Sequence, residues 1–209
     1  MCKLNRALCL CFKSIAIVIF SLSLSGCATL FSTKKPSPSL SWPARKQILT
    51  AMHAWHAEGA MAIKMPDQSL SAHFDWQQHD NQSYLMTLFG PLGMGSVVIQ
   101  GNQQTFTLRT ADGKTFTATS PEQLIRQQLG WNLPISNLYY WIRGLPAPKK
   151  TSMITFDSAH RLAHLAQQGW SIEYLDYDNF NGIELPSKLL LKGDRIELRI
   201  VVHRFDTGE

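Results

Sequence analysis

Few side chains in the 209-residue chain have the types and spacing that catalysis or phosphate binding requires. Gly113-Lys114-Thr115 matches the end of a phosphate-binding loop, but Leu108 stands where that loop needs its first glycine. An Asp-Gly pair, formed here by Asp112 and Gly113, is typical of a tight hairpin turn. The chain also has no Gly-x-Ser-x-Gly sequence, the elbow that presents the nucleophile of many hydrolases. The sequence therefore predicts a turn here and no nucleotide site.

Histidine and aspartate residues give no stronger sign of a catalytic or metal centre. His53 and His56 lie three residues apart in a segment that we expect to be helical, but no Glu-x-x-His motif accompanies them. Asp176 and Asp178 are predicted to be solvated turn residues rather than paired catalytic carboxylates. We therefore expect no catalytic residue, no metal and no cofactor, and we expect that the protein is not an enzyme.

Cys27 is the one cysteine in a context that indicates chemistry. Three basic residues precede an apolar run over residues 14–24, which is shorter than the about 20 residues of a membrane-spanning helix. The run ends in Leu24-Ser25-Gly26-Cys27, which has the pattern of a lipobox, where the cysteine is lipidated and becomes the new N-terminus. The alternative is an ordinary signal peptide followed by a chance cysteine.

The other three cysteines, Cys2, Cys9 and Cys11, all lie in the segment that processing would remove. Cys27 would then be the only cysteine left, and its thiol would be used for the lipid. We therefore predict neither an internal disulfide nor a zinc site built from cysteines.

The sequence predicts three parts. Residues 1–26 form a lipoprotein signal peptide that is removed, residues 27–41 form the lipidated N-terminus and a flexible tether rich in Ser, Thr and Pro, and residues 42–209 form a single domain. Three of the 20 basic residues and none of the 15 acidic residues lie in the first part, so the remainder is only weakly basic and a nucleic-acid partner is unsupported. Ala28 follows the cysteine where enteric bacteria place Asp to retain a lipoprotein in the inner membrane, which predicts the outer membrane, periplasmic face.

Three short helices are predicted. Pro43 begins the first, next to an N-cap at Ser41 or Trp42. The second begins at a capping box over residues 120–123, and the third covers residues 135–144. The apolar face expected on the first helix consists of Ile48, Leu49, Met52 and Trp55.

From Ala57 onward, alternating apolar and polar residues predict about ten strands joined mostly by short turns. Residues 161–170 suit a helix by composition, but their position between strands favours a hairpin that turns at Gln168-Gly169. A last hairpin is expected to turn at Gly193-Asp194. These links predict a mainly β (α+β) fold whose antiparallel sheet is large enough to curl. One face of two strands is expected to carry Leu70, Ala72, Phe74 and Trp76, and Ile196, Leu198, Ile200 and Val202.

The apolar residues could fill a core or line a cavity. The six tryptophans are residues 42, 55, 76, 131, 141 and 170, and periodicity alone favours an ordinary core. Loop 90–95 raises a related question, because Leu92 and Met94 are apolar at the tip of a Gly- and Pro-rich turn where polar residues are usual.

The sequence resembles the LolB family over most of the chain after the lipobox. The resemblance rests on HAEGAMAIK with HFDWQQ, on LFGPLGMGSVVI, on PISNLYYWIRGLP and on the closing GDRIELRI. The stretches Trp141–Pro146 and Pro91–Gly93 are its most specific parts, whereas Met94 and Gly95 make the loop tip more apolar and flexible than the family leads us to expect. The resemblance implies an open, incomplete antiparallel β-barrel of about ten or eleven strands, with short helices covering the mouth of a hydrophobic cavity.

The resemblance also implies a function and a set of partners. A monomeric, lipid-anchored outer-membrane protein of this kind accepts lipoproteins from a LolA-like periplasmic carrier into its cavity and inserts them into the outer membrane. Its partners are that carrier, the acyl chains of the cargo and outer-membrane lipids. Cys27 would hold the lipid, and Leu92 and Met94 would touch the membrane. The residues expected to line the cavity are Phe74, Trp76, Met86, Leu88, Phe106 and Leu108 on the sheet, and Trp141 and Ile142 on the helical lid.

Four alternatives remain open at this stage. A one-residue error in register would turn the expected cavity face outward. Leu92 could fold back onto a neighbouring strand instead of facing the membrane. The protein could also be a structural outer-membrane lipoprotein with a solid core that scaffolds an assembly, or a hydrolase whose site the sequence does not reveal.

Overall fold

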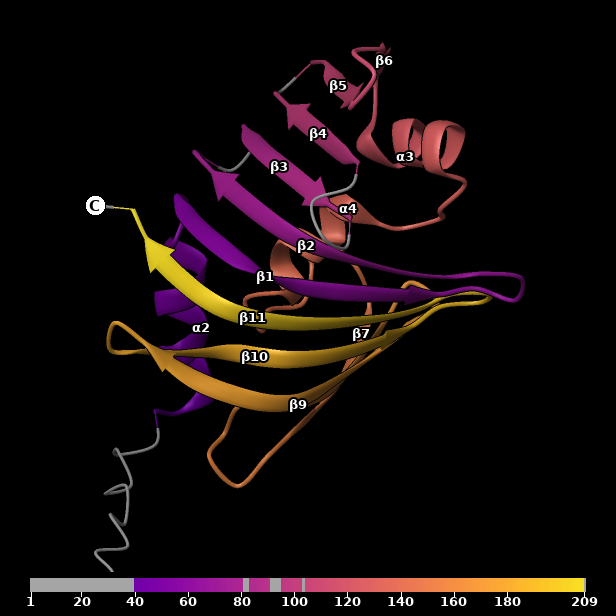
Figure 1. The fold of residues 1–209 in the computed structure, drawn as a ribbon. Coiled ribbons are helices and arrows are strands. Elements are labelled where there is room, and N and C mark those ends of the chain that lie inside the picture. The colour runs from indigo at the N-terminus through magenta and orange to yellow at the C-terminus, as the bar shows by residue number, and fades with distance from the viewer. Residues whose placement is uncertain (1–39, 81–82, 91–94, 103, 209) are drawn as a thin grey trace, which may run out of the picture. The chain divides into compact units, whose positions relative to one another are not determined.

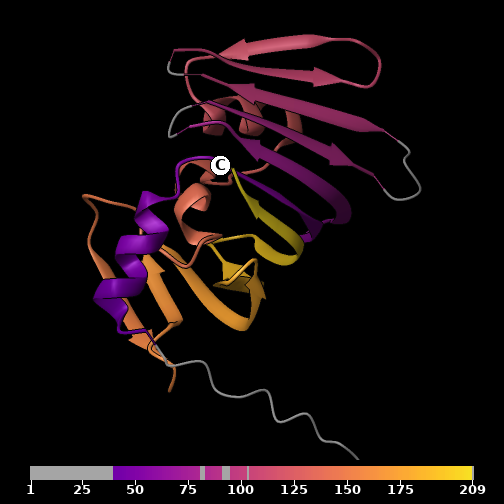
Figure 2. The same ribbon diagram turned by 90° about the vertical axis from the view of Figure 1, so that its left-hand side faces the viewer.

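The structure is a computed structural model that describes residues 40–80, 83–90, 95–102 and 104–208. Its main element is an 11-stranded antiparallel sheet with the order β6-β5-β4-β3-β2-β1-β11-β10-β9-β8-β7. Figures 1 and 2 show the sheet curling around the helices while β6 and β7 remain at its two ends. The predicted open antiparallel barrel is therefore confirmed.

The strands in chain order are β1 (Trp55–Lys64), β2 (Ser69–Gln78), β3 (Tyr84–Phe89), β4 (Ser96–Gly101), β5 (Phe106–Thr110), β6 (Thr115–Ala118), β7 (Ser152–Phe156), β8 (Leu162–Gln167), β9 (Trp170–Phe180), β10 (Ile183–Lys192) and β11 (Glu197–Thr207). None of the helices in the described ranges is long and apolar enough to cross a membrane.

One face of the sheet is apolar because successive side chains along a strand point to opposite sides. On β2, Phe74 and Trp76 are buried, whereas Asp75 and Gln77, which each follow one of them, are only half-buried. The register continues this face across the sheet, because buried β2 residues stand opposite buried residues of β3. On the other half of the sheet, the predicted apolar residues Ile196, Leu198, Ile200 and Val202 are all buried.

The first helix, α2 (Trp42–Ala51), begins as predicted, with Ser41 at the N-cap and Pro43 in the first turn. It ends earlier than its apolar pattern suggests. Leu49 is buried, but Ile48 is 42% exposed and Trp55 is already the first residue of β1. The assignment of Trp55 to the helix was wrong because pairing of β1 with strands on both sides outweighs local helical spacing.

Pairing of β1 corrects the expectation for the two histidines, and pairing of β9 with β10 corrects that for two aspartates. His53 follows the end of α2 and His56 belongs to β1, so the two histidines do not share a helix. Asp176 and Asp178 were predicted to be turn residues, but both lie within the long strand β9. The Asp176 carboxylate is exposed and accepts a hydrogen bond from Lys188 Nζ at 2.9 Å, as expected of a solvated group.

The other two helices form as predicted. Helix α3 (Pro121–Leu129) begins at Ser120, whose side-chain oxygen accepts a hydrogen bond from the backbone N–H of Gln123 at 3.1 Å. Helix α4 (Ile135–Trp141) is followed by Gly144, whose φ of 75° suits the end of a helical segment. The segment that carries α3 and α4 joins β6 to β7, the two strands at the ends of the sheet order.

Three predicted hairpin turns are also present. Residues 161–170 turn at Gln168-Gly169, where both residues have positive φ, and not as a helix. Gly113 has a φ of 82° in the turn between β5 and β6, which confirms a hairpin in place of a phosphate-binding loop. The turn after β10 is closed by a hydrogen bond from Gly193 N–H to the Ile196 carbonyl.

Gly59 gives a test of how tightly the sheet is packed. A Cβ atom added there would lie 2.1 Å from the Val201 carbonyl oxygen and 2.8 Å from the Phe74 ring. Because the backbone oxygen cannot move without disturbing the β1–β11 ladder, Gly59→Ala should lower the free energy of unfolding by about 2–3 kcal/mol. Denaturant unfolding would measure this. Ala62→Ser, on the opposite face of the same strand, is the control and should change stability little; equal stability of both variants would contradict the close approach.

Candidate functional site

The concave face of the first half of the sheet carries the six residues predicted on the cavity side. Trp76 stands opposite Met86, Phe74 opposite Leu88, and Leu108 opposite Ile99, so a single register brings them to one face. All are buried except Phe106, which is half-buried near one end of the face. The structure thus places them together on one side of the sheet, whereas their role in binding cargo remains a prediction.

The two predicted lid residues, Trp141 and Ile142, lie at the end of α4 and are buried. Trp141 is fixed by two polar contacts with the sheet. Its indole N–H donates to Gln167 Oε1 at 2.9 Å, and its carbonyl accepts from the Tyr174 hydroxyl at 3.1 Å. Gln167 also exchanges hydrogen bonds with both backbone groups of Ala147. These residues therefore attach the lid to the sheet and do not form its free edge.

A cleft of about 310 Å³ opens between the concave face and the helices. Of the eight predicted cavity residues, only Trp76 and Phe106 line it, because the other six pack into the core beside it. The remaining lining comes from β2, β3, the loop before β5, and helices α3 and α4. These residues are Gln78, Tyr84, Asn102, Pro121, Ile135, Ser136, Tyr139 and Tyr140.

Aromatic rings form one wall of this cleft. The Tyr84 ring lies 6.1 Å from the Trp76 ring and 6.4 Å from the Phe106 ring, measured between centroids. Burial raises the pKa of the Tyr84 hydroxyl, and the negative charge of Glu122 raises it further, so the hydroxyl stays protonated. The sequence analysis missed Tyr84, although it lies two residues before Met86 and therefore shares the predicted face.

A larger cleft of about 620 Å³ lies between turns of the sheet and the loop joining α3 to α4. Turn residues such as Asp67, Asp194 and Arg195 contribute to its lining, together with Gln68 and Asn132. Charged side chains and turn backbone suit water better than a hydrocarbon chain. The smaller, uncharged cleft on the concave face is therefore the better candidate for an apolar ligand.

Arg143 is the main site residue that the sequence analysis did not find. The residue is 1% exposed, and its guanidinium carbon lies 4.0 Å from the centroid of the Tyr139 ring. Nε donates to the Tyr139 carbonyl at 3.0 Å, and Nη1 donates to the carbonyls of Leu49 and Met52 at the end of α2. Burial lowers the pKa of Arg143. Its position within the Trp141–Pro146 stretch was the available signal, since a cation is unusual in so apolar a segment.

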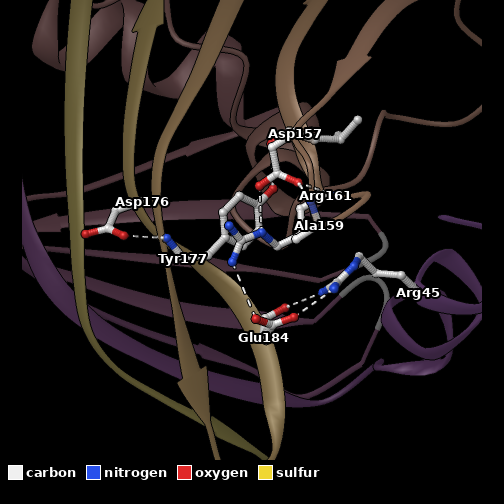
Figure 3. Close-up of polar contacts among 8 residues, drawn as sticks. Arg45, Asp157, Ala159, Arg161, Asp176, Tyr177 and Glu184 are labelled. Carbon is white, nitrogen blue, oxygen red and sulfur yellow. Dashed lines mark hydrogen bonds and ion pairs between the residues drawn. The ribbon is translucent and has the colours of Figure 1, made fainter. Parts of the chain in front are cut away.

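A second buried arginine, Arg45, holds the first half of α2. Figure 3 shows Glu184 between two arginines: Arg45 Nη2 lies 2.8 Å and Arg161 Nη1 lies 3.4 Å from its carboxylate oxygens. Arg161 Nε also contacts Asp157 at 2.7 Å. Burial raises the pKa of Asp157, but the hydrogen bonds and charge of Arg161 outweigh it, so this pKa lies below its usual value. The network joins α2 to β10 and to the turn between β7 and β8.

Among the described residues, one group of side chains has its metal-ligating atoms close enough together to hold an ion, and it lies on the convex face. His56, Glu58 and Asp75 hold theirs within 4.8 Å of one another, with His56 Nε2 at 3.0 Å from Asp75 Oδ1. Arg204 and Gln77 already contact the two carboxylates. The group is partly exposed and behaves as a hydrogen-bonded surface network. His53 is not part of it.

Cys27, Leu92 and Met94 lie outside the described residues. The strands on both sides of the loop are described: Phe89 pairs with Ser96, so β3 and β4 form the hairpin that the sequence predicts.

A protein-family model described as "Outer membrane lipoprotein LolB" matches residues 53–204. The chain belongs to the LolB family. An outer-membrane lipoprotein LolB of Pseudomonas syringae pv. syringae (strain B728a) is 39% identical over 192 residues, which cover 89% of this chain and 93% of the relative. A LolB of Pseudomonas paraeruginosa (strain DSM 24068 / PA7) is 40% identical over 182 residues, covering 86% and 88%.

Solved structures share the LolB fold at much lower identity. A LolA superfamily protein from Nitrosomonas europaea aligns with a TM-score of 0.53 at 7% identity, covering 81% of this chain and 94% of that one. An outer membrane lipoprotein-sorting protein domain from Vibrio parahaemolyticus gives 0.51 at 6% identity, covering 78% and 90%. At these identities the likeness is one of fold.

The contacts of Arg143 predict that it ties α4 to α2 in this LolB family member. Arg143→Met would leave the carbonyls of Tyr139, Leu49 and Met52 without their donor, so the free energy of unfolding should fall by about 2–4 kcal/mol. Arg143→Lys should recover part of the loss. Denaturant unfolding gives the total, and amide exchange should show faster opening of α2 and α4.

Arg199→Met is the matched control, because Arg199 is exposed and its guanidinium forms an ion pair with Glu197 on the surface. It should leave both stability and exchange near wild type. An Arg143→Met variant as stable as this control would show that the buried hydrogen bonds do not hold the lid.

Proposed function

We propose that the chain is an outer-membrane lipoprotein that accepts lipoproteins from a periplasmic carrier and inserts them into the outer membrane. The observation that carries this proposal is an uncharged, aromatic-lined cleft beneath a helical lid, in a chain that belongs to the LolB family. Apolar walls remove acyl chains from water, and the lid can limit contact with water during the handover.

Handover of this kind needs no chemical fuel. If the receptor binds the acyl chains about 1.4 kcal/mol more tightly than the carrier does, the equilibrium constant for transfer favours the receptor tenfold. Each methylene group left in water costs about 0.8 kcal/mol, so free diffusion of an acylated protein is strongly unfavourable. The cargo must therefore pass directly from the mouth of one protein to that of the other.

The cleft as described is small for the whole cargo. Its volume of about 310 Å³ is near the lower limit for a pocket that holds one small ligand, whereas bacterial lipoproteins carry three acyl chains. Full acceptance therefore requires the lid to move away from the sheet. The contacts of Arg143, Gln167 and Tyr174 are the polar bonds that such a movement would break or rearrange.

The anchor and the tether are part of the same proposal. Residues 1–26 are removed, Cys27 carries the lipid, and residues 27–41 connect it to the domain over residues 42–209. The compact unit that begins at Ser39 supports this division. Lipid on Cys27 would hold the protein on the periplasmic face of the outer membrane, where it acts as a monomer with a LolA-like carrier and outer-membrane lipids as partners.

One observation favours a second function, that of a structural lipoprotein with a solid core. Most of the concave face is filled, because six of the eight predicted cavity residues pack against other core residues. A scaffold would keep this core closed, whereas a receptor would open it. Transfer of a lipoprotein from a purified LolA-like carrier to the soluble domain distinguishes the two functions.

The transfer assay gives the first functional prediction. Phe106→Glu places a carboxylate in the aromatic wall of the cleft, where an acyl chain would have to desolvate it, so acceptance of cargo should fall at least tenfold. Leu175→Glu is the control, because Leu175 is 57% exposed on the opposite face of the sheet, and it should accept cargo normally. With the thermal midpoint measured for both, normal transfer to a folded Phe106→Glu protein would contradict a role for this cleft.

Leu92→Glu should separate acceptance from delivery. We propose that Leu92 and Met94 touch the membrane, where full burial of each would contribute about 1.5–3 kcal/mol. A carboxylate resists entering the apolar layer, so incorporation of cargo into liposomes should fall while thermal midpoint and transfer from the carrier stay near wild type. Normal incorporation would remove the loop from the mechanism, and a large fall in midpoint would instead make Leu92 a core residue.

A further inference from the structure

Tyr84 has a buried hydroxyl that the fold itself does not use. The residue lies in β3, is 8% exposed and lines the cleft of the concave face. Its hydroxyl oxygen has no hydrogen-bond partner among the residues that the structure describes. A buried polar group without a partner costs stability. The hydroxyl oxygen is covered in the closed structure, so a ligand that enters the cleft when the lid moves away from the sheet can supply the missing partner.

The surroundings of Tyr84 keep its ring in this place. A Cβ atom added to Gly101 on the neighbouring strand would lie 2.5 Å from the Tyr84 ring and 2.8 Å from the Phe106 ring. The absence of a side chain at Gly101 therefore allows both rings to lie close to the strand. The ring of Tyr84 is also flanked by that of Trp76. The hydroxyl is consequently held by packing and needs no hydrogen bond to fix it.

The lining of the cleft selects the charge of the ligand. Its polar side chains are those of Gln78, Tyr84, Asn102, Ser136 and two further tyrosines, and none of the residues that line it is charged. Because the cleft offers no cation, a phosphate or a carboxylate would enter without compensation. A neutral group that accepts a hydrogen bond, such as an ester or amide carbonyl, suits both the uncharged lining and the free hydroxyl donor.

We propose that the Tyr84 hydroxyl donates a hydrogen bond to an ester or amide carbonyl at the acylated N-terminus of the lipoprotein cargo, while the attached acyl chain lies along the aromatic wall of the cleft. This inference rests on the proposed function and names the part of the cargo that the cleft recognises. Acylated cysteine has its carbonyl groups where the chains begin, so one donor beside an apolar wall is enough to set the depth of a chain. Phospholipids also carry esters, but their phosphate makes them poor ligands here.

The test compares two lipids that differ only in carbonyl groups. Dioctanoylglycerol carries two ester carbonyls, and dioctylglycerol, its diether analogue, carries none. Both are titrated into the soluble domain, and displacement of a fluorescent acyl probe reports their affinity. Tyr84→Phe should weaken binding of the diester by about twofold to tenfold and leave binding of the diether unchanged. A dioctanoyl phosphatidylglycerol titration should show weaker binding than the neutral diester to the wild-type protein.

Tyr174→Phe is the matched control. Tyr174 is also 8% exposed, but its hydroxyl donates to the Trp141 carbonyl at 3.1 Å. Removing that hydroxyl should lower the thermal midpoint, because the carbonyl loses its partner. Tyr84→Phe should leave the midpoint unchanged or raise it, since the lost hydroxyl makes no bond in the free protein. This difference tests the unpaired state of Tyr84 before any ligand is added.

The outcomes separate the inference from the function on which it rests. If wild-type protein displaces no probe with either lipid and accepts no lipoprotein from the carrier, the proposed function fails. If wild-type protein binds the diester but Tyr84→Phe binds it equally well, the inference fails and the function stands. Equal losses for diester and diether would also overturn it, because they would show that the variant had changed the shape of the cleft. Tighter binding of the anionic lipid would overturn the choice of a neutral ligand.

Discussion

Pairing of the first strand with the last determines the rest of this fold. Strand β1 pairs with β11 over ten residue pairs, which joins two halves of the sheet that are each built from local hairpins. This arrangement leaves β6 and β7 as the edges of the sheet, and the chain must travel between them. The segment that makes this crossing carries α3 and α4, passes over the concave face and covers it. The open barrel and its lid are therefore two results of one topology.

Polar contacts, and not only apolar burial, connect the lid to the sheet. The free energy of apolar contact between α4 and the concave face is roughly proportional to the buried area and has no preferred direction. Apolar contact alone would therefore allow the lid to slide. Hydrogen bonds run from Arg143 to α2, from Tyr174 to the last residue of α4, and from Gln167 to the segment after α4. Together they fix the lid in one position. Each hydrogen bond contributes only modest net free energy, provided that its donor and acceptor can bond to water or to another partner when the lid moves. A lid held in this way is well ordered and can still be released.

Much of the fold could be predicted from the sequence because its signals are local. Alternation predicts the face on which Phe74 and Trp76 lie. The start of α3 is predicted by Ser120 and Pro121, and a hairpin is favoured over a helix at Gln168-Gly169. Trp55 and His56 were misassigned because their conformation depends on pairing with β11 and β2, and Asp176 and Asp178 because theirs depends on pairing with β10. Neither the buried contacts of Arg143 nor the unpaired hydroxyl of Tyr84 could be read from spacing, because both depend on segments far away in the sequence. Long-range pairing thus decides the details that matter most at the cleft.

A closed resting state has a physical advantage for a protein of this proposed function. An apolar hollow that stayed open beside a membrane would gain free energy by taking up any available acyl chain, because burial of hydrocarbon does not distinguish its source. Keeping the lid closed by polar bonds makes each ligand offset the cost of opening, which lowers the apparent affinity for all lipids alike. Discrimination must then come from a contact that only the correct ligand completes. An uncharged cleft beside the unpaired Tyr84 hydroxyl has this property. It penalises a phosphate, which would have to shed its water, and it favours a neutral carbonyl that already needs a donor.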